Sequence, residues 1–321
     1  MKFSKLYPFL FSYNFINNSV FSSCVSLNFY NSLRSSSNSL YFSKTNPSAF
    51  VLPSTLYIKR LKMSESSRAP QKHLLDVKAR YVGEPGTKSF RVEFVNSSGK
   101  NVSPWHDLPL SPSEGHVTMV VEIPRNTRAK MEIGTGLEHN PIVQDLFADG
   151  SLRDLDCPMY WNYGAIPCTW EAPVPYEHRY KDDNGEERRM SLVGDNDPLD
   201  VVDVGRKTLK VGDVVAMKPV GALALIDQKE IDWKILAVSP DDEHYSNINE
   251  LEDVDKFYPG TTTGILEFFR WYKTPRGKPL NEFLPKKTFV SRKEAMEILE
   301  QTGEHYKQLL QGTLKHNLWT H

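Results

Sequence analysis

Residues 194–200, Gly-Asp-Asn-Asp-Pro-Leu-Asp, place three carboxylates within a short segment near the middle of the chain. Asp195 and Asp197 are two residues apart, so they project to the same side of an extended backbone. Asp200 would face away, but Pro198 prevents a regular central strand and can bend the chain back. Carboxylates that converge repel one another strongly unless a counter-charge is present. Because oxygen ligands suit hard cations, the segment predicts a Mg²⁺ site with retained waters.

A second acidic pair follows, and basic residues accompany it. Asp227 and Asp232 come about one hairpin later, and Lys234 is two residues beyond Asp232, on the same side of an extended segment. Lysine and arginine suit phosphate oxygens. Carboxylates, metal ions and basic groups together indicate phosphoryl transfer to water, in which metals bridge phosphate oxygens and activate the nucleophile.

Taken singly, these residues have ordinary structural explanations. Three of them, Asp232, Tyr272 and Glu122, could be ordinary surface or salt-bridging residues. Lys130 with Glu132 could form a solvated strand face. Tyr163 could pack in an aromatic core. Their joint occurrence is what favours a site.

Several blocks occur in a fixed order along the chain. They are residues 121–125, 129–132, 162–167, 195–200, 232–234 and 269–273. In this order they resemble the family I soluble inorganic pyrophosphatases, with 195–200 matching the family signature. The resemblance covers about residues 75–312 and is similar to the longer eukaryotic-type enzymes. The short stretch at 153–163 looks most like the plastid-targeted branch.

The resemblance implies a mainly β fold with flanking helices (α+β) around a five-stranded OB-like barrel. It implies hydrolysis of pyrophosphate to two phosphates with several Mg²⁺ ions, three to four in the family; Mn²⁺ can substitute and Ca²⁺ inhibits. Eukaryotic members suggest a homodimer, whereas the plastid-like branch also admits a monomer.

The resemblance also implies roles for individual residues. The implied metal ligands are Asp195, Asp200, Asp232, Asp227 and Glu132. The implied phosphate-binding residues are Lys130, Arg153, Tyr272 and Lys273. Asp197 would accept the proton of the attacking water. Tyr163 and Lys234 would complete the pocket, and Glu122 would orient its neighbours from behind them.

The chain departs from the family pattern at a few positions. A tyrosine usual in the family falls on Met159, with Tyr160 adjacent, which puts proton donation to the leaving phosphate in doubt. The acid and glycine expected after Asp227 are Gln228 and Lys229, and Arg276 replaces a usual acid.

The elements that would position these residues are mostly short strands. Strands are predicted at 88–95, 116–123, 129–133, 214–220, 222–226 and 235–238. Helices are predicted at 250–257, at 262–272 and from a capping box that begins at Ser291. Residues 173–193 are densely charged, which predicts an exposed, mobile loop. Short strands with frequent turns indicate a small closed or partly closed barrel.

The first 64 residues contain no Asp or Glu but carry seven Lys or Arg, in a Ser-rich context. This composition is typical of an organellar transit peptide, with a plastid first and a mitochondrion second. The alternatives are a disordered cytosolic tail, or a cytosolic form that starts at Met63. We therefore predict a transit peptide at 1–64, a linker at 65–75, a catalytic domain at 76–312 and a tail at 313–321.

Charge and composition bear on other function classes. All 40 Asp and Glu residues lie outside the N-terminal segment, so the remaining chain is acidic, which disfavours nucleic-acid binding. No stretch approaches about 18 consecutive apolar residues, so no membrane span is predicted. The competing hypotheses are an OB-type binding module, a nucleotide pyrophosphohydrolase and a calcium-binding structural domain. Three cysteines without CxxC spacing favour free thiols.

Overall fold

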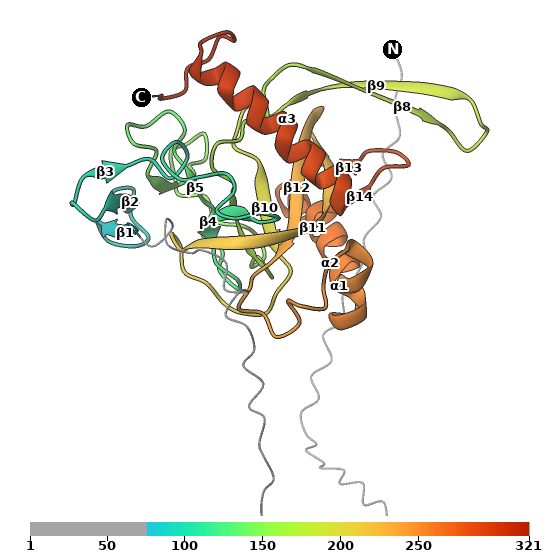
Figure 1. Ribbon diagram of the computed structural model, residues 1–321. Coiled ribbons are helices and arrows are strands. Elements are labelled where there is room, and N and C mark those ends of the chain that lie inside the picture. Colours follow the sequence, from blue (N-terminus) through green and yellow to red (C-terminus); the bar gives the residue numbers. More distant parts are fainter. Residues whose placement is uncertain (1–75, 321) are drawn as a thin grey trace, which may run out of the picture. The chain divides into compact units, whose positions relative to one another are not determined.

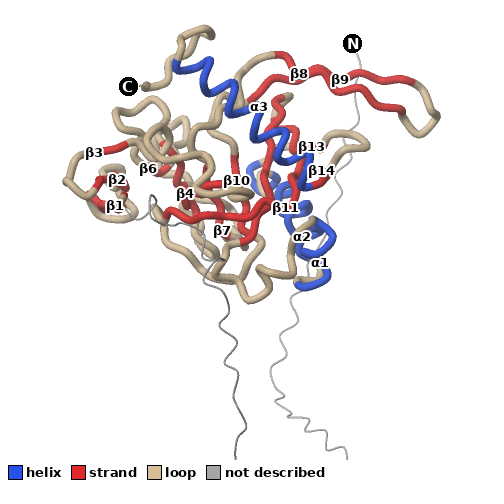
Figure 2. The backbone as a smooth tube through the Cα atoms, in the orientation of Figure 1, coloured by secondary structure: helices blue, strands red, loops and turns tan. Residues whose placement is uncertain are grey.

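The computed structural model describes residues 76–320. The predicted transit peptide and linker, at 1–75, lie outside the described residues, as does His321. Among the regular elements, strands outnumber helices (Figures 1 and 2). The three α-helices of the described part all belong to the C-terminal third. The mainly β class with flanking helices is confirmed. Within residues 76–320 no helix is long and apolar enough to cross a membrane.

Five strands form a closed barrel. They are β4 (Val117–Ile123), β7 (Asn162–Ala165), β10 (Asp200–Asp203), β11 (Val214–Asp227) and β12 (Glu230–Val238). β11 pairs with β4, β4 with β7, β7 with β10 and β10 with β12, and β12 pairs back with β11. The β10–β12 pair is parallel and the other four are antiparallel. This ring matches the five-stranded Greek-key barrel of OB-like folds, as predicted.

Strand β4 lies between two apolar clusters and is buried at every position. Met119 and Val121 on one face join the same cluster as Val201 and Ile235, whereas Val120 on the other face joins a second cluster. Alternation along a strand explains this division. Glu122 lies at an irregularity in the β4–β7 pairing, between Val121 and Ile123, and is also buried, 5% exposed.

The long strand β11 corrects one prediction. Residues 214–220 and 222–226 were predicted as two strands separated by Gly221, but they form one strand with a bulge between Pro219 and Gly221. A bulge lets one strand bend and pair with different partners along its length. A side chain at Gly221 would place its Cβ 2.7 Å from the Val290 carbonyl oxygen, so glycine is required at this close approach.

A second sheet and the helices flank the barrel. The sheet contains β1 (Val77–Val82), β2 (Arg91–Asn96), β3 (Asn101–Val102), β5 (Met131–Ile133) and β6 (Ile142–Gln144). The helices are α1 (Leu251–Phe257), α2 (Thr261–Trp271) and α3 (Arg292–Leu310), with short strands β13 (Glu282–Phe283) and β14 (Phe289–Ser291) between the last two. The predicted capping box of Ser291 and Glu294 is present at the start of α3. Through buried Ile265 and Phe269, helix α2 packs against the barrel strands.

Residues 173–193 do not form the predicted loop. Most of them belong to a hairpin of β8 (Pro175–Lys181) and β9 (Glu187–Gly194), which extends from the barrel as a two-stranded arm (Figure 1). Tyr176 and His178 alternate with charged residues and face inward; Tyr176 packs edge-on against Trp233, and His178 Nε2 lies 2.8 Å from the Pro285 carbonyl oxygen. This alternation has the period of two that is typical of a strand, within a segment of high charge density.

The residues after α3 pack back onto the domain. The backbone N–H of Trp319 donates to the carbonyl oxygen of Thr135 at 2.8 Å. The Trp319 ring also contacts the ring of His139 edge-on. The contact matters for the site because Thr135 lies in the loop that follows Glu132 and lines the pocket.

Candidate active site

The structure gathers all of the site residues named above into one pocket, which opens beside the barrel. They come from the strands of both sheets or the residues next to them, from the β6–β7 and β9–β10 loops, and from the end of α2. The set is Glu122, Lys130, Glu132, Arg153, Tyr163, Asp195, Asp197, Asp200, Asp227, Asp232, Lys234, Tyr272 and Lys273.

The acidic motif is a loop held against the backbone of Glu171. Asn196 N–H donates to the Glu171 carbonyl oxygen, and Glu171 N–H donates to the Asp197 carbonyl oxygen, both at 2.9 Å. Asn196 adopts a left-handed conformation (φ 73°), which asparagine tolerates better than most residues. A Cβ at Gly194 would lie 2.4 Å from the Glu171 carbonyl oxygen, so glycine is needed there. These constraints turn the motif's carboxylates into the pocket.

Glu171 is a site residue that the sequence did not identify. Carboxylate oxygens of Glu171, Asp195 and Asp232 all lie within 4.8 Å of one another. One Glu171 oxygen accepts the backbone N–H of Trp233 at 3.0 Å, while the other is buried and has no hydrogen-bond partner among residues 76–320. The available signal was its position shortly after the 162–167 block, which does not by itself distinguish a ligand from a surface glutamate.

Burial and mutual repulsion raise the pKa values of these acids. Burial, followed by the charges of Glu132 and Asp200, raises the pKa of Asp197 to about 7. Burial also raises the pKa of Asp195 and of Glu171 well above the usual range, and neighbouring carboxylates add to both shifts. Such a cluster becomes fully ionised at neutral pH only if a cation neutralises it.

The donor set fits a hard divalent cation. It consists of carboxylate oxygens, and the buried Glu171 Oε2 and Asp227 Oδ1 have no hydrogen-bond partner within the described residues. Oxygen-only donors favour Mg²⁺, Ca²⁺ or Mn²⁺ over softer metals. The residues therefore match the class of hard divalent cation to which the predicted Mg²⁺ belongs.

Lys234 lies within the acidic cluster. Its Nζ pairs with Asp200 and Asp232 and donates to Tyr163 Oη at 3.0 Å. Burial disfavours the ammonium form, but the charges of Asp200 and Asp232 outweigh burial and raise the pKa of Lys234. Lys234 therefore stays charged and fixes both carboxylates.

The Asp197 carboxylate is placed differently from its neighbours. None of the hydrogen bonds or ion pairs within residues 76–320 involves this carboxylate, whereas Asp200 and Asp232 both pair with Lys234. Its burial and its pKa near 7 suit a group that exchanges a proton at neutral pH.

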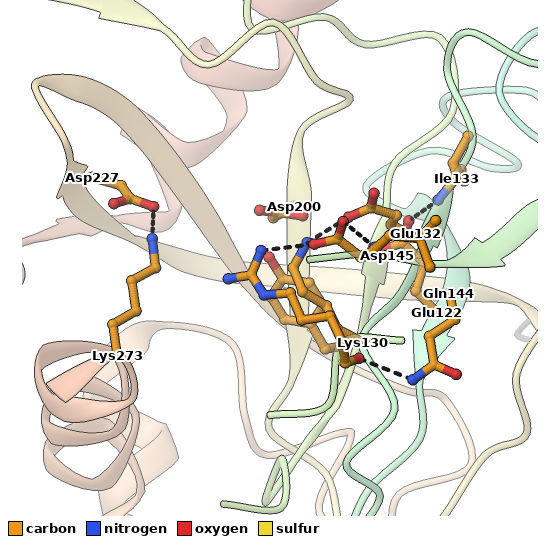
Figure 3. Close-up of polar contacts among 12 residues, drawn as sticks. Glu122, Lys130, Glu132, Ile133, Gln144, Asp145, Asp200, Asp227 and Lys273 are labelled. Atoms are coloured by element: carbon orange, nitrogen blue, oxygen red, sulfur yellow. Dashed lines mark hydrogen bonds and ion pairs between the residues drawn. The ribbon is translucent and has the colours of Figure 1, made fainter. Parts of the chain in front are cut away.

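Two basic groups border the acids on opposite sides, with Asp200 between them in the view of Figure 3. Lys273 pairs with Asp227 on one side. On the other, Asp145 accepts from Lys130 Nζ at 2.9 Å and from Arg153 at 2.7 Å. Asp145 was not identified from the sequence. It holds two of the predicted phosphate-binding residues together.

Behind Lys130, a backbone contact fixes the strand that carries Glu132. The N–H of Ile133 donates to Glu122 Oε1 at 2.7 Å (Figure 3). Burial, followed by the charge of Asp200, raises the pKa of Glu122 well above the usual range. Glu122 therefore contacts the backbone of β5.

Met159 and Tyr160, where the sequence departs from the family pattern, both lie outside the pocket lining. Met159 is 3% exposed and packs in an apolar cluster. Tyr160 is 52% exposed, packs edge-on against Trp161 and Phe268, and does not line the pocket. Tyr160 therefore does not replace the usual tyrosine.

Comparisons with known proteins agree with this geometry. The family model described as inorganic pyrophosphatase matches residues 119–307. The chain is 42% identical to the chloroplastic soluble inorganic pyrophosphatase 6 of Arabidopsis thaliana, over 74% of this chain and 76% of that protein. It is 35% identical to the mitochondrial inorganic pyrophosphatase 2 of Mus musculus, over 78% and 79%. A crystal structure of a type I inorganic pyrophosphatase from Toxoplasma gondii superposes with a TM-score of 0.66 at 42% identity, over 73% of this chain and 100% of that one.

Proposed function

The chain belongs to the inorganic pyrophosphatase family, and from this premise we propose that it hydrolyses pyrophosphate to two phosphate ions in a Mg²⁺-dependent reaction. The observation that supports this most is the buried carboxylate cluster of Glu171, Asp195 and Asp232, with basic side chains on either side. Pyrophosphate is small and highly anionic, so its hydrolysis depends on positioning and on neutralising phosphate charge.

We propose that the carboxylates hold the metal ions. Asp195, Asp200 and Asp232 would bind the first, and Asp200 would also contact a second. Asp227 would bind an ion that arrives with the substrate, as would Asp232, and Glu132 would hold one through water. When bound, these ions would lower the pKa of the attacking water and neutralise phosphate oxygens.

Asp197 accepts the proton of the attacking water in this proposal. Its carboxylate is buried, its pKa is near 7, and it takes no part in the ion pairs of Lys234. A base with a pKa near the working pH combines an adequate ionised fraction with useful basicity. Lys234 and Tyr163 keep Asp200 in place beside it.

The basic residues bind the phosphates. Lys130 and Arg153, joined through Asp145, grip oxygens on one side, and Tyr272 with Lys273 grips them on the other. Their positive charge stabilises the negative charge that develops on the departing phosphate, so this phosphate needs less protonation in order to leave. This matters more here because neither Met159 nor Tyr160 places a hydroxyl in the pocket.

Phosphate release from pyrophosphate tests the proposal. We expect rapid release with Mg²⁺, release with Mn²⁺, and inhibition when Ca²⁺ is added, because the larger ion loosens octahedral geometry. ATP serves as the comparison substrate, and little release from it would separate this activity from that of a nucleotide pyrophosphohydrolase. Preference for ATP, or undiminished turnover in EDTA, would refute the proposal.

We further propose that residues 1–64 direct the chain to a plastid, with a mitochondrion as the alternative. The acid-free, basic composition supports targeting, and similar proteins carry chloroplastic or mitochondrial names. A fusion of residues 1–64 to a fluorescent protein should accumulate in the plastid, while a fusion of residues 76–320 should not. A diffuse signal from the first fusion would contradict the targeting function.

A further inference from the structure

Arg276 links two parts of the pocket wall that are far apart in the sequence. It ends the 3₁₀ turn η3 (Thr274–Arg276), which follows Tyr272 and Lys273 directly. Its Nε donates to Asp156 Oδ2 at 2.7 Å, and its Nη2 donates to the Asp154 carbonyl oxygen at 2.8 Å. Within residues 76–320, no other hydrogen bond or ion pair joins residues 272–280 to residues 145–158.

The Arg276 guanidinium is also stacked on an aromatic ring. It lies 4.3 Å from the ring centroid of Phe147, in the loop that begins after Asp145. A planar guanidinium can hydrogen-bond along its edge while stacking on its face, which a lysine ammonium cannot do. Arg276 therefore contacts both ends of the loop that carries Arg153.

Each segment that Arg276 joins carries phosphate-binding groups. On one side, Arg153 precedes Asp154 directly, and the Arg153 carbonyl oxygen accepts the backbone N–H of Lys130 at 3.0 Å. On the other, the Arg276 N–H donates to the Lys273 carbonyl oxygen at 3.2 Å, and Pro275 stiffens the turn. A shift of Arg276 would therefore change the distance between Lys130 and Arg153 on one side and Lys273 on the other.

We propose that Arg276 is a positioning residue that holds the Lys130–Arg153 side and the Tyr272–Lys273 side of the pocket at the spacing of the two pyrophosphate phosphates. Its Nε and Nη2 donate to Asp156 and to the Asp154 carbonyl oxygen, so in this proposal it acts through the segment that carries Arg153. The inference rests on the proposed hydrolysis of pyrophosphate.

Steady-state kinetics with pyrophosphate and Mg²⁺ test the role of Arg276. We expect Arg276→Lys and Arg276→Ala each to raise KM about tenfold, with a smaller change in kcat, because misplaced binding groups weaken substrate binding before they affect the proton acceptor. A substrate-binding role would predict that Arg276→Lys, which keeps the positive charge, retains most of the affinity. Arg80→Ala, which removes a surface arginine paired with Glu93 outside the pocket, is the matched control and should leave KM unchanged.

A double-mutant cycle separates positioning from direct binding. Asp156→Ala should raise KM as Arg276→Ala does, and the double variant should be no worse than either single variant, because both remove the link between Arg276 and Asp156. Additive losses, or a lower KM in Asp156→Ala, would overturn the inference, since they would mean that Arg276 attracts the substrate directly. Unchanged KM in Arg276→Ala would overturn it as well.

Two further measurements distinguish failure of the proposed function from failure of the positioning role of Arg276. A wild-type chain that does not release phosphate refutes the proposed function, whereas normal wild-type turnover with unaffected Arg276 variants refutes the positioning role alone. Thermal unfolding in EDTA shows whether each variant folds. If Arg276→Ala does not fold, the charge exchange Arg276→Asp with Asp156→Arg should restore KM relative to Arg276→Asp alone; no restoration would reject the link.

Discussion

Replacing Asp197 by asparagine should reduce kcat for pyrophosphate by about a thousandfold, since general-base catalysis typically contributes 10²–10⁴-fold. The amide keeps the size of the side chain but cannot accept a proton from the attacking water. The Asp197 carboxylate takes part in no hydrogen bond or ion pair within residues 76–320, so the substitution should leave the cluster around Lys234 in place. Phosphate release at saturating Mg²⁺ and pyrophosphate measures the change.

The KM for pyrophosphate shows whether Asp197→Asn also affects substrate binding. It should change much less than kcat in Asp197→Asn, because the removed interaction belongs to the transition state. Asp241→Asn, which alters an exposed aspartate paired with Lys207, controls for loss of an acidic charge and should behave as the wild type does. If kcat is preserved in Asp197→Asn, another group takes the proton and the assignment of the base is wrong.

The sequence predicted those parts of the fold that depend on local patterns. The run of β-forming residues at 116–123 became β4, and the capping box at Ser291 starts α3. The continuity of β11 through Gly221 was missed, because a glycine within a strand can end it or create a bulge. Whether the strand ends or forms a bulge at the glycine depends on the neighbouring strands, and the local sequence does not specify those neighbours.

The hairpin at 173–193 was missed for a related reason. Its charge density outweighed the alternation of Tyr176, His178 and Tyr180, which needed Trp233 and Pro285 from other segments to become a buried face. Strand preference reflects packing against neighbours more than backbone chemistry. Charge along a segment therefore predicted its exposure better than its conformation.

For the site, motif residues were predictable and their supporting residues were not. Asp195 and Asp200 stand out because several acids crowd one short segment. Glu171 and Asp145 are single acids, and their meaning comes from tertiary contacts: one lies against Asp195 and Asp232, and the other bridges Lys130 and Arg153. A lone carboxylate in a sequence carries no information about its partners.

Glu171 leads to a second large expected effect. Replacing it by glutamine should weaken Mg²⁺ binding by about 10–100-fold, as is usual when a carboxylate that contacts metal ligands is altered. The glutamine oxygen can still accept the Trp233 N–H, so the local fold is preserved while one negative charge leaves the cluster. Calorimetric titration with Mg²⁺ measures the affinity, and the Mg²⁺ dependence of turnover should shift to higher concentration in parallel.

The same substitution should change metal-free stability in the opposite direction. Burial raises the folded-state pKa of Glu171 well above its unfolded value, so its contribution to stability is complete below the unfolded pKa and is lost as pH rises through the folded pKa. Glutamine does not ionise, so in EDTA the Tm of Glu171→Gln should equal or exceed that of the wild type at alkaline pH, an advantage absent in acid. Glu300→Gln, on the exposed face of α3, should change neither Tm nor Mg²⁺ affinity. If Glu171→Gln has a lower Tm than the wild type at alkaline pH and an unchanged Mg²⁺ affinity, Glu171 is a purely structural acid. In that case the carboxylate of Glu171 does not contribute to the negative charge that attracts the cations.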